Sequence, residues 1–183
     1  MILVQDNFFT EETFKEIQKY CNDNEFQIVT KGEKEFSVLK TPENLIPLLK
    51  IDGHEMIFSF IRQAHKDFDT EPRIHCDHII QGKRTSLARV FYISDKDEVS
   101  DNGTAFFINN KWGLKAPEDL TDQEFDRLIL EDANDLSKWK ENSLVGAVPN
   151  RMITYNSSYW HSKFPPQIER GRRIVLVAFY SKV

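Results

Sequence analysis

The chain has 183 residues, which is enough for one domain with a substantial core and short for two full-sized domains. Its formal net charge of −5 argues against a protein that binds nucleic-acid backbones through a broad basic face, and its two cysteines argue against a disulfide-rich secreted domain. The N-terminal residues lack the basic start and apolar run of a signal peptide, and no window approaches the roughly 20 apolar residues that cross a bilayer. We therefore expect a single-domain, cytoplasmic protein without membrane or nucleic-acid partners.

Residues 1–70 are expected to form a mostly helical support layer. It opens with a short strand at Ile2 to Val4, followed by a helix that Thr10 can cap and that ends near residues 22–24. A second helix is predicted over about residues 53–68. Its evidence is an apolar stripe at helical spacing, formed by Met56, Ile57, Phe60, Ile61 and Ala64.

From about Arg73 onward, short runs rich in β-branched and aromatic residues alternate with polar turns. The expected strands cover residues 73–80, 85–94, 104–108, 144–148, 152–156 and 173–181. Many short strands after a helical segment indicate an α+β, mainly β domain. We expect a β-sandwich or jelly roll at residues 71–183, backed by the N-terminal helices.

Residues 109–143 interrupt these strands with a polar, acidic segment. A helix is expected from about Pro117 to Glu131, and Phe125, Leu128 and Ile129 lie on one side of this segment. The insert can therefore fold onto the rest of the domain. We interpret it as a candidate lid.

The local element that carries chemistry is His75-Cys76-Asp77, inside an expected strand. Alternate side chains of a strand point to the same face, so His75 and Asp77 project together while Cys76 points the other way. A third donor is available in His161, 84 residues after Asp77 and close to the end of another expected strand. Two histidines and one carboxylate on one face of a metal leave open positions, as in non-haem Fe(II) oxygenases.

The last expected strand begins with two cations, Arg172 and Arg173. A guanidinium grips a carboxylate with two parallel hydrogen bonds, so one of the pair can anchor a dicarboxylic co-substrate. Arg151 and Lys163 are further cations that could meet an anionic substrate. Trp160, next to His161, is a candidate for the wall of a substrate cleft.

These elements occur in an informative order along residues 73–180, and the sequence resembles the 2-oxoglutarate and Fe(II)-dependent dioxygenases, particularly the prolyl-4-hydroxylase-like branch. The resemblance is carried by His75-x-Asp77, Thr85 to Ile93, Asn102-Gly103-Thr104-Ala105-Phe106, Pro149, Arg151, Trp160-His161 and Gly171-Arg172-Arg173. It implies a double-stranded β-helix (jelly roll) with iron at one mouth.

The resemblance also implies roles for single residues. His75, Asp77 and His161 match the iron ligands of the family, and Arg173 matches its basic anchor for 2-oxoglutarate. Arg173 is preferred to Arg172 because Phe179 then falls where the last strand usually carries an aromatic residue. Tyr92 looks like the tyrosine that, in several relatives, hydrogen-bonds the distal carboxylate of 2-oxoglutarate.

The expected reaction consumes 2-oxoglutarate and O₂ and releases succinate and CO₂. It most often hydroxylates a C–H bond, here of a protein side chain such as proline or of a small metabolite. Two alternatives stay open: a catalytically inactive jelly-roll binding module, and a cupin-like metalloenzyme that uses another metal. Fold analogy does not choose the primary substrate, because specificity lies in variable loops.

Overall fold

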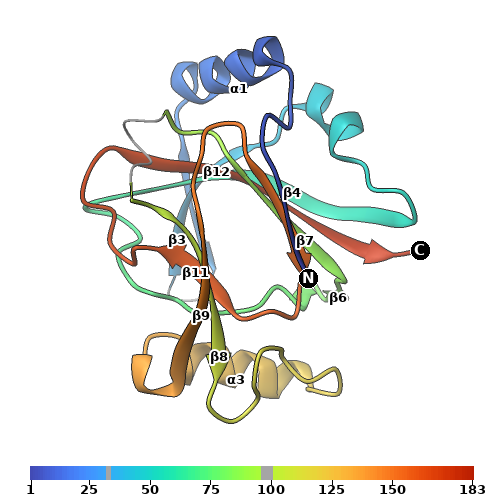
Figure 1. Ribbon diagram of the computed structural model, residues 1–183, viewed down its shortest axis with the longest axis vertical. Coiled ribbons are helices and arrows are strands. Elements are labelled where there is room, and N and C mark those ends of the chain that lie inside the picture. The colour runs from blue at the N-terminus through green and yellow to red at the C-terminus, as the bar shows by residue number, and fades with distance from the viewer. Residues whose placement is uncertain (32–33, 96–100) are drawn as a thin grey trace.

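The computed structural model describes residues 1–31, 34–95 and 101–183, and within these ranges the strands form a seven-stranded and a three-stranded antiparallel sheet (Figure 1). The large sheet has the order β1 (Ile2–Gln5), β10 (Met152–Asn156), β7 (Leu87–Tyr92), β12 (Arg172–Lys182), β4 (His54–His65), β3 (Lys34–Lys40) and β2 (Gln27–Lys31). The small sheet has the order β11 (His161–Phe164), β8 (Gly103–Asn109) and β9 (Trp139–Gly146), and a short hairpin pairs β5 (Ile79–Ile80) with β6 (Lys83–Arg84). This arrangement confirms the expected mainly β class.

Helix α1 (Glu11–Asp23) covers the outer face of the large sheet (Figure 1). The side chain of Thr10 caps it by accepting a hydrogen bond from the Thr13 N–H at 3.2 Å, which satisfies one free donor of the first turn. Ile17 and Cys21 are buried against the sheet. The expected N-terminal strand and first helix are therefore confirmed, and a 3₁₀-helix, η1 (Glu43–Leu49), packs in the same layer.

The second expected helix is wrong, because residues 54–65 form strand β4 between β12 and β3. Both faces of β4 are covered, so apolar residues occur on both. The pairing with β12 also skips one residue: Phe58 lies opposite Phe179, but Met56 lies opposite Tyr180. Strand β4 therefore carries apolar residues on both faces and has one unpaired position. Together these make its apolar residues recur at the spacing of a helix. Strands β2 and β3 were likewise not expected in this region.

The central strand β12 divides its side chains between two cores, as strand alternation requires. Leu176 and Tyr180 face outward, into the cluster that α1 covers. Val175 and Phe179 face inward, toward the small sheet. This phase decides which of the two neighbouring arginines at the start of β12 points into the molecule.

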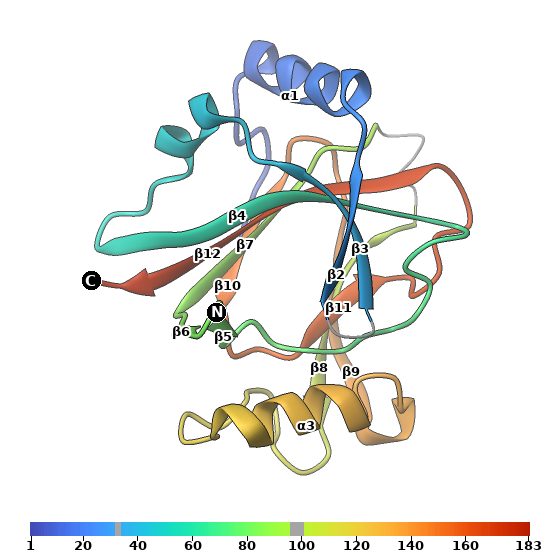
Figure 2. The same ribbon diagram turned by 180° about the vertical axis from the view of Figure 1, so that it is seen from behind.

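Helix α3 (Asp122–Asp132) packs below the small sheet, on the side away from the large sheet (Figure 2). Thr121 and Glu124 form a reciprocal capping box at its N-terminus. Phe125 and Leu128 belong to a third apolar cluster with Trp139 and Trp160. The side chain of Ile129, expected on the same face, lies outside the described residues. A single 3₁₀ turn, η2 (Leu136–Lys138), leads into β9.

Most of the expected strands exist. Residues 85–94, 104–108, 152–156 and 173–181 contain or overlap β7, β8, β10 and β12, and 144–148 overlaps the end of β9, which begins earlier at Trp139. No helix in the described part of the chain is long and apolar enough to cross a membrane.

Candidate metal centre and its cavity

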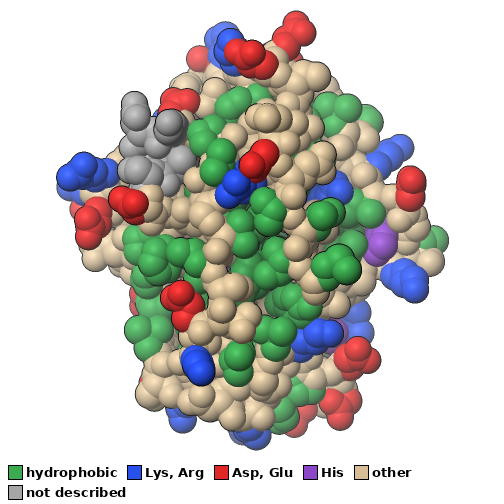
Figure 3. All heavy atoms as spheres, viewed as in Figure 1, with side chains coloured by type: hydrophobic (Ala, Val, Ile, Leu, Met, Phe, Trp, Pro, Cys, Tyr) green, Lys and Arg blue, Asp and Glu red, His purple; other side chains and the backbone are tan. Residues whose placement is uncertain are grey.

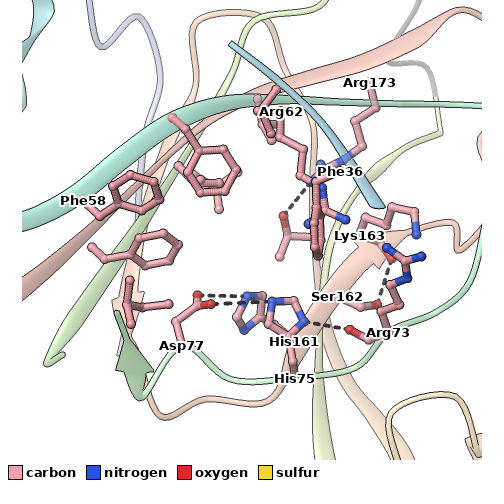
Figure 4. Close-up of a pocket in the computed structure, with 18 of the residues that line it drawn as sticks. Phe36, Phe58, Arg62, Arg73, His75, Asp77, His161, Ser162, Lys163 and Arg173 are labelled. Carbon is pink, nitrogen blue, oxygen red and sulfur yellow. Dashed lines mark hydrogen bonds and ion pairs between the residues drawn. The ribbon is translucent and has the colours of Figure 1, made fainter. Parts of the chain in front are cut away.

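A cavity of about 520 Å³ lies between the two sheets. Its lining comes from β2, β3, β4, β7, β10 and β12 of the large sheet and from β8 and β11 of the small one. Figure 4 shows His75, Asp77 and His161 together at one side of this cavity, with Arg173 at the far side and Phe58 to one flank. The three expected metal ligands are thus brought together, although 84 residues separate Asp77 from His161.

The three ligand side chains converge on one point. His75 Nε2 lies 3.6 Å from Asp77 Oδ1, and His161 Nε2 lies 3.3 Å from Asp77 Oδ2. One donor atom from each of the three residues lies within 4.8 Å of the other two. Separations of this size fit one divalent ion held about 2 Å from each donor.

Main-chain hydrogen bonds, and not a regular strand, hold His75 and Asp77 in place. The expected continuous strand at residues 73–80 is wrong: His75 forms an isolated bridge with His161, and the Asp77 N–H donates to the Ser157 carbonyl at 2.8 Å. Because alternate residues are tied to the neighbouring chain, the segment stays extended and keeps strand alternation. Cys76 accordingly points away from the cavity, into the cluster beneath the small sheet.

Each histidine is also fixed through its other ring nitrogen. His75 Nδ1 lies 2.7 Å from the Arg73 carbonyl, and His161 Nδ1 lies 3.0 Å from the Tyr159 carbonyl. A carbonyl only accepts, so both Nδ1 atoms carry the proton and both Nε2 atoms offer a lone pair to the cavity. This arrangement is the one that metal-bound histidines use to set their tautomer and ring orientation.

The charge states suit a cation. Burial, and then the neighbouring His161, lower the pKa of His75 to about 4, so its ring is neutral at pH 7. Burial alone would raise the pKa of Asp77, but His161 and His75 outweigh it and hold the pKa below its usual value. Neutral imidazole and ionised carboxylate are the forms in which these groups bind a metal.

Arg173 lies at the far side of the cavity and is almost fully buried. Its Nη2 donates to the Gly103 carbonyl at 3.2 Å and to Thr104 Oγ1 at 3.4 Å, whereas no acceptor among the described residues contacts its Nε. A buried N–H without a partner costs free energy, and a carboxylate in the cavity would satisfy it. Arg172 points to the other face of β12, where it donates to Asn22 on α1.

Gly103 has no room for a side chain. A Cβ atom built there would lie 2.3 Å from the Val145 carbonyl oxygen on the adjacent strand β9. The close approach of β8 and β9 at this point therefore requires glycine. It also sets the position of the Gly103 carbonyl that receives Arg173.

Tyr92 does not line the cavity. It points inward as expected, in phase with Ala88 and Val90, but its ring is fully buried and its hydroxyl lies 2.7 Å from Thr104 Oγ1. Thr104 stands between Tyr92 and the cavity, which it lines itself. Sequence reasoning thus identified the inward face of β7, and the contact of Tyr92 with 2-oxoglutarate stays a prediction.

A second hydroxyl group was not anticipated. Tyr155 on β10 lines the cavity, and its hydroxyl lies 3.0 Å from His161 Nε2 and 3.4 Å from Asp77 Oδ2. Burial, followed by the charge of Asp77, raises its pKa well above the usual value, so the group stays protonated and donates. It can orient a ligand carboxylate or an oxygen atom of a bound molecule beside the metal.

A cluster of cations lines the cavity on the same side as Arg173. Arg62, Arg73 and Lys163 all contact the buried carboxylate of Asp69: Arg73 Nη1 at 3.2 Å, Lys163 Nζ at 3.4 Å and Arg62 in a close ion pair. Burial works against ionisation of Asp69, but Arg62, Lys163 and Arg73 together lower its pKa. Of this cluster, sequence reasoning had named only Lys163.

Several other candidate residues lie elsewhere. Arg151 forms an ion pair with Asp6 at 2.5 Å and does not line the cavity. Trp160 is buried on the opposite side of the small sheet, beside α3. None of the described residues in 109–143 lines the cavity, so this insert packs beneath the metal side and is not placed as a lid.

Sequence comparisons give no relatives, whereas structural comparisons give many. No family model matches the chain. No curated protein matches it either. SnoK, a non-haem alpha-ketoglutarate-dependent carbocyclase from nogalamycin biosynthesis, is similar with a TM-score of 0.69 at 13% identity, over 99% of this chain and 79% of that one.

Two further structures extend the comparison. HygX from Streptomyces hygroscopicus, with nickel and 2-oxoglutarate bound, has a TM-score of 0.58 at 12% identity, over 100% of this chain and 83% of its own. A prolyl-4-hydroxylase from Pseudomonas putida has a TM-score of 0.55 at 11% identity, over 100% and 92%. The chain has the fold of these oxygenases. The expected jelly roll is therefore confirmed.

Proposed function

We propose that this protein is a non-haem Fe(II)- and 2-oxoglutarate-dependent oxygenase. The observation that carries the proposal is the convergence of His75, Asp77 and His161 at one side of a cavity whose other side holds the buried Arg173. The three ligand side chains would hold the metal, and a dicarboxylic co-substrate would bind both the metal and Arg173. The similar folds of 2-oxoglutarate-dependent enzymes support the same function.

The ligand residues fit Fe(II). Two imidazoles and one carboxylate are the donor set of non-haem iron oxygenases, and they leave coordination positions open. Bound iron would supply the one-electron and O₂ chemistry that protein side chains lack. The protein holds the donors in their metal-binding protonation states: the Arg73 and Tyr159 carbonyls fix the imidazole tautomers, and His161 and His75 lower the pKa of Asp77 although its burial acts in the opposite direction.

Arg173 is the proposed anchor for the distal carboxylate of 2-oxoglutarate. Burial lowers its pKa, but a guanidinium remains charged at pH 7, so the group is a fixed cation at the end of a largely apolar cavity. Thr104 adds a hydroxyl beside it, and Tyr92 holds that hydroxyl from behind. Tyr92 thus acts on the co-substrate through Thr104.

The cavity favours a small-molecule primary substrate over a protein side chain. Its volume of about 520 Å³ lies within the usual range for small-ligand sites, and residues of both sheets surround it. The proposed products are an oxidised, most simply hydroxylated, substrate together with succinate and CO₂. The expected cytoplasmic location stays a prediction.

The proposal is tested by two measurements on the purified protein. Under anaerobic conditions, Fe(II) and 2-oxoglutarate together should give the visible charge-transfer absorption of their chelate, and neither should give it alone. In air, succinate should form from 2-oxoglutarate, and His161→Ala should abolish both signals.

Each other result points elsewhere. A protein that binds neither iron nor 2-oxoglutarate contradicts the proposal and favours a binding module that retains only the fold. A protein that binds another divalent metal tightly, without succinate formation in Fe(II), favours a metalloenzyme of a different class. Metal analysis after anaerobic reconstitution separates these two outcomes.

A further inference from the structure

The cavity has two chemically different flanks beyond the metal ligands and Arg173. We define the aromatic wall as Phe58, Phe60 and Phe179, and the cationic wall as Arg62, Arg73 and Lys163; all six residues line the cavity. Figure 4 shows Phe58 on the flank opposite Arg73 and Lys163, with His75, Asp77 and His161 between them. A molecule that fills the cavity therefore lies beside the metal site, with the aromatic wall on one side and the cationic wall on the other.

The cationic wall carries more positive than negative charge. Its three cations share the buried Asp69, and the exposed Glu71 adds one contact, to Arg73 Nε at 3.2 Å. Among the residues that the structure describes, one positive charge is left after these two carboxylates are counted. Arg173 adds another nearby, and the proposed 2-oxoglutarate would neutralise that one only.

The two arginines of this wall both pack against Phe36. Their guanidinium carbons lie 4.9 Å and 5.6 Å from the ring centroid of Phe36, which stands beside both. Their side chains are 21% and 18% exposed, whereas Arg173 is 6% exposed, so they lie nearer to solvent. An entering molecule meets them before it reaches the co-substrate anchor. Each guanidinium has five N–H donors, and a single carboxylate such as Asp69 cannot satisfy those of both.

From this arrangement we infer that the primary substrate is a small amphipathic anion. Its carboxylate or phosphate group binds Arg73 and Arg62, and its hydrocarbon part lies along the aromatic wall, which places the intervening carbon beside the metal. The inference rests on the proposed function and specifies its substrate class. Phosphate and carboxylate have the same bidentate match to arginine, so the experiment must distinguish them.

The test compares matched neutral and charged probes on the protein loaded anaerobically with Fe(II) and 2-oxoglutarate. The probes are 3-phenylpropionate, its neutral amide 3-phenylpropionamide, and 2-phenylethyl phosphate, with binding measured by calorimetry. At least one anion should bind about tenfold or more tightly than the amide, which is the size of effect expected for a charge-assisted pair. The stronger of the two anions identifies the head group.

Variants assign the preference to the cationic wall. Arg73→Gln should remove most of it, while Asp69 keeps Arg62 and Lys163 as partners, and Arg73→Lys should restore part of it. The matched control is Lys66→Gln, which removes an equal charge from an exposed pair with Asp67 outside the cavity and should leave the preference unchanged. Thermal unfolding of each variant checks that the fold is intact.

Two results would overturn the inference: equal binding of the anions and the amide, or an unchanged preference in a folded Arg73→Gln protein. The charge-transfer absorption is recorded in the same samples. If it is absent, the proposed function fails; if it is present and the anions show no advantage, only the substrate class is wrong.

Discussion

The two sheets contribute different things to one cavity. The small sheet and the segment tied to it provide most of the polar groups that line the cavity, and hydrogen bonds to the main chain fix the metal ligands among them: the His75–His161 bridge, the Asp77 to Ser157 bond and the carbonyls behind each imidazole. The large sheet instead presents side chains from alternating positions of β4, β7 and β12. Substitutions on the large sheet can therefore alter the shape and charge of the cavity without moving the metal ligands. The metal ligands and most of the apolar side chains that shape the cavity therefore come from different sheets, while Tyr155 of β10 contacts the ligands from the large sheet.

Loss of a metal ligand is the most damaging change to the small-sheet side. Asp77→Ala should reduce iron affinity by more than about 100-fold, because loss of a ligand exceeds the 10- to 100-fold effects of groups that only support ligands. Iron content and succinate formation measure this. Urea unfolding should show that the large-sheet core is retained. If Asp77→Ala bound iron about as tightly as the wild type, Asp77 would not be a metal ligand.

Asp69→Asn makes the complementary change, at the shared ion-pair partner of the cationic wall. It leaves Arg62, Arg73 and Lys163 without their shared buried carboxylate, so the free energy of unfolding should fall by about 3 kcal/mol at pH 7. Iron binding should persist in the folded fraction.

The same variant has a pH signature. The pKa of Asp69 is lowered in the folded protein, so its stabilising effect is present above the usual value of 3.8 and is lost as pH falls below it. The wild type should therefore lose stability more steeply with acid than Asp69→Asn does. Parallel acid-unfolding curves for the two proteins would contradict the assigned role.

Arg173 links the large sheet to the small one through Gly103 and Thr104. Arg173→Ala should raise the KM for 2-oxoglutarate about 30-fold or more, the lower bound for removing one partner of a buried charge pair. Arg172→Ala, on the opposite face of β12, is the matched control and should leave that KM unchanged. If Arg173→Ala and Arg172→Ala raised this KM equally, the inward orientation of Arg173 would not be what makes it the anchor.

The smallest effect is expected at Thr104. Thr104→Val keeps the shape but removes the hydroxyl that lies between Tyr92 and Arg173, which should cost about 1 kcal/mol, or about fivefold in the KM for 2-oxoglutarate. Tyr92→Phe should have a smaller effect, since Tyr92 does not line the cavity, whereas Thr104 does. A larger effect of Tyr92→Phe than of Thr104→Val would indicate that Tyr92 contacts 2-oxoglutarate directly.

The metal side could be predicted from the sequence because its information is local. A two-residue spacing in an extended segment is enough to direct His75 and Asp77 to one face, and this holds even though the segment is not a regular strand. The choice of Arg173 over Arg172 came from the family resemblance, and the alternation of β12 agrees with it, because Phe179 faces inward and Arg172 points to the opposite face.

The cationic wall could not be predicted in this way. Arg62 lies on β4, which has the apolar spacing of a helix, and Arg73 follows a turn that no periodic pattern describes. What joins them is Asp69, through ion pairs that no local sequence pattern indicates. Lys163 could be named in advance because it lies two residues from His161 on a short strand.

Because of the tight contact at Gly103, we expect substitutions at this position to be poorly tolerated. Any larger residue would force β9 away from β8 and displace the carbonyl that receives Arg173, so the edge of the small sheet and the grip on the co-substrate would deteriorate together. If the proposed function is correct, related proteins can acquire new substrates through changes at Phe58 or Arg73, but we expect all of them to keep glycine at position 103. In a directed-evolution library that randomises position 103, almost all functional clones should encode glycine at this position.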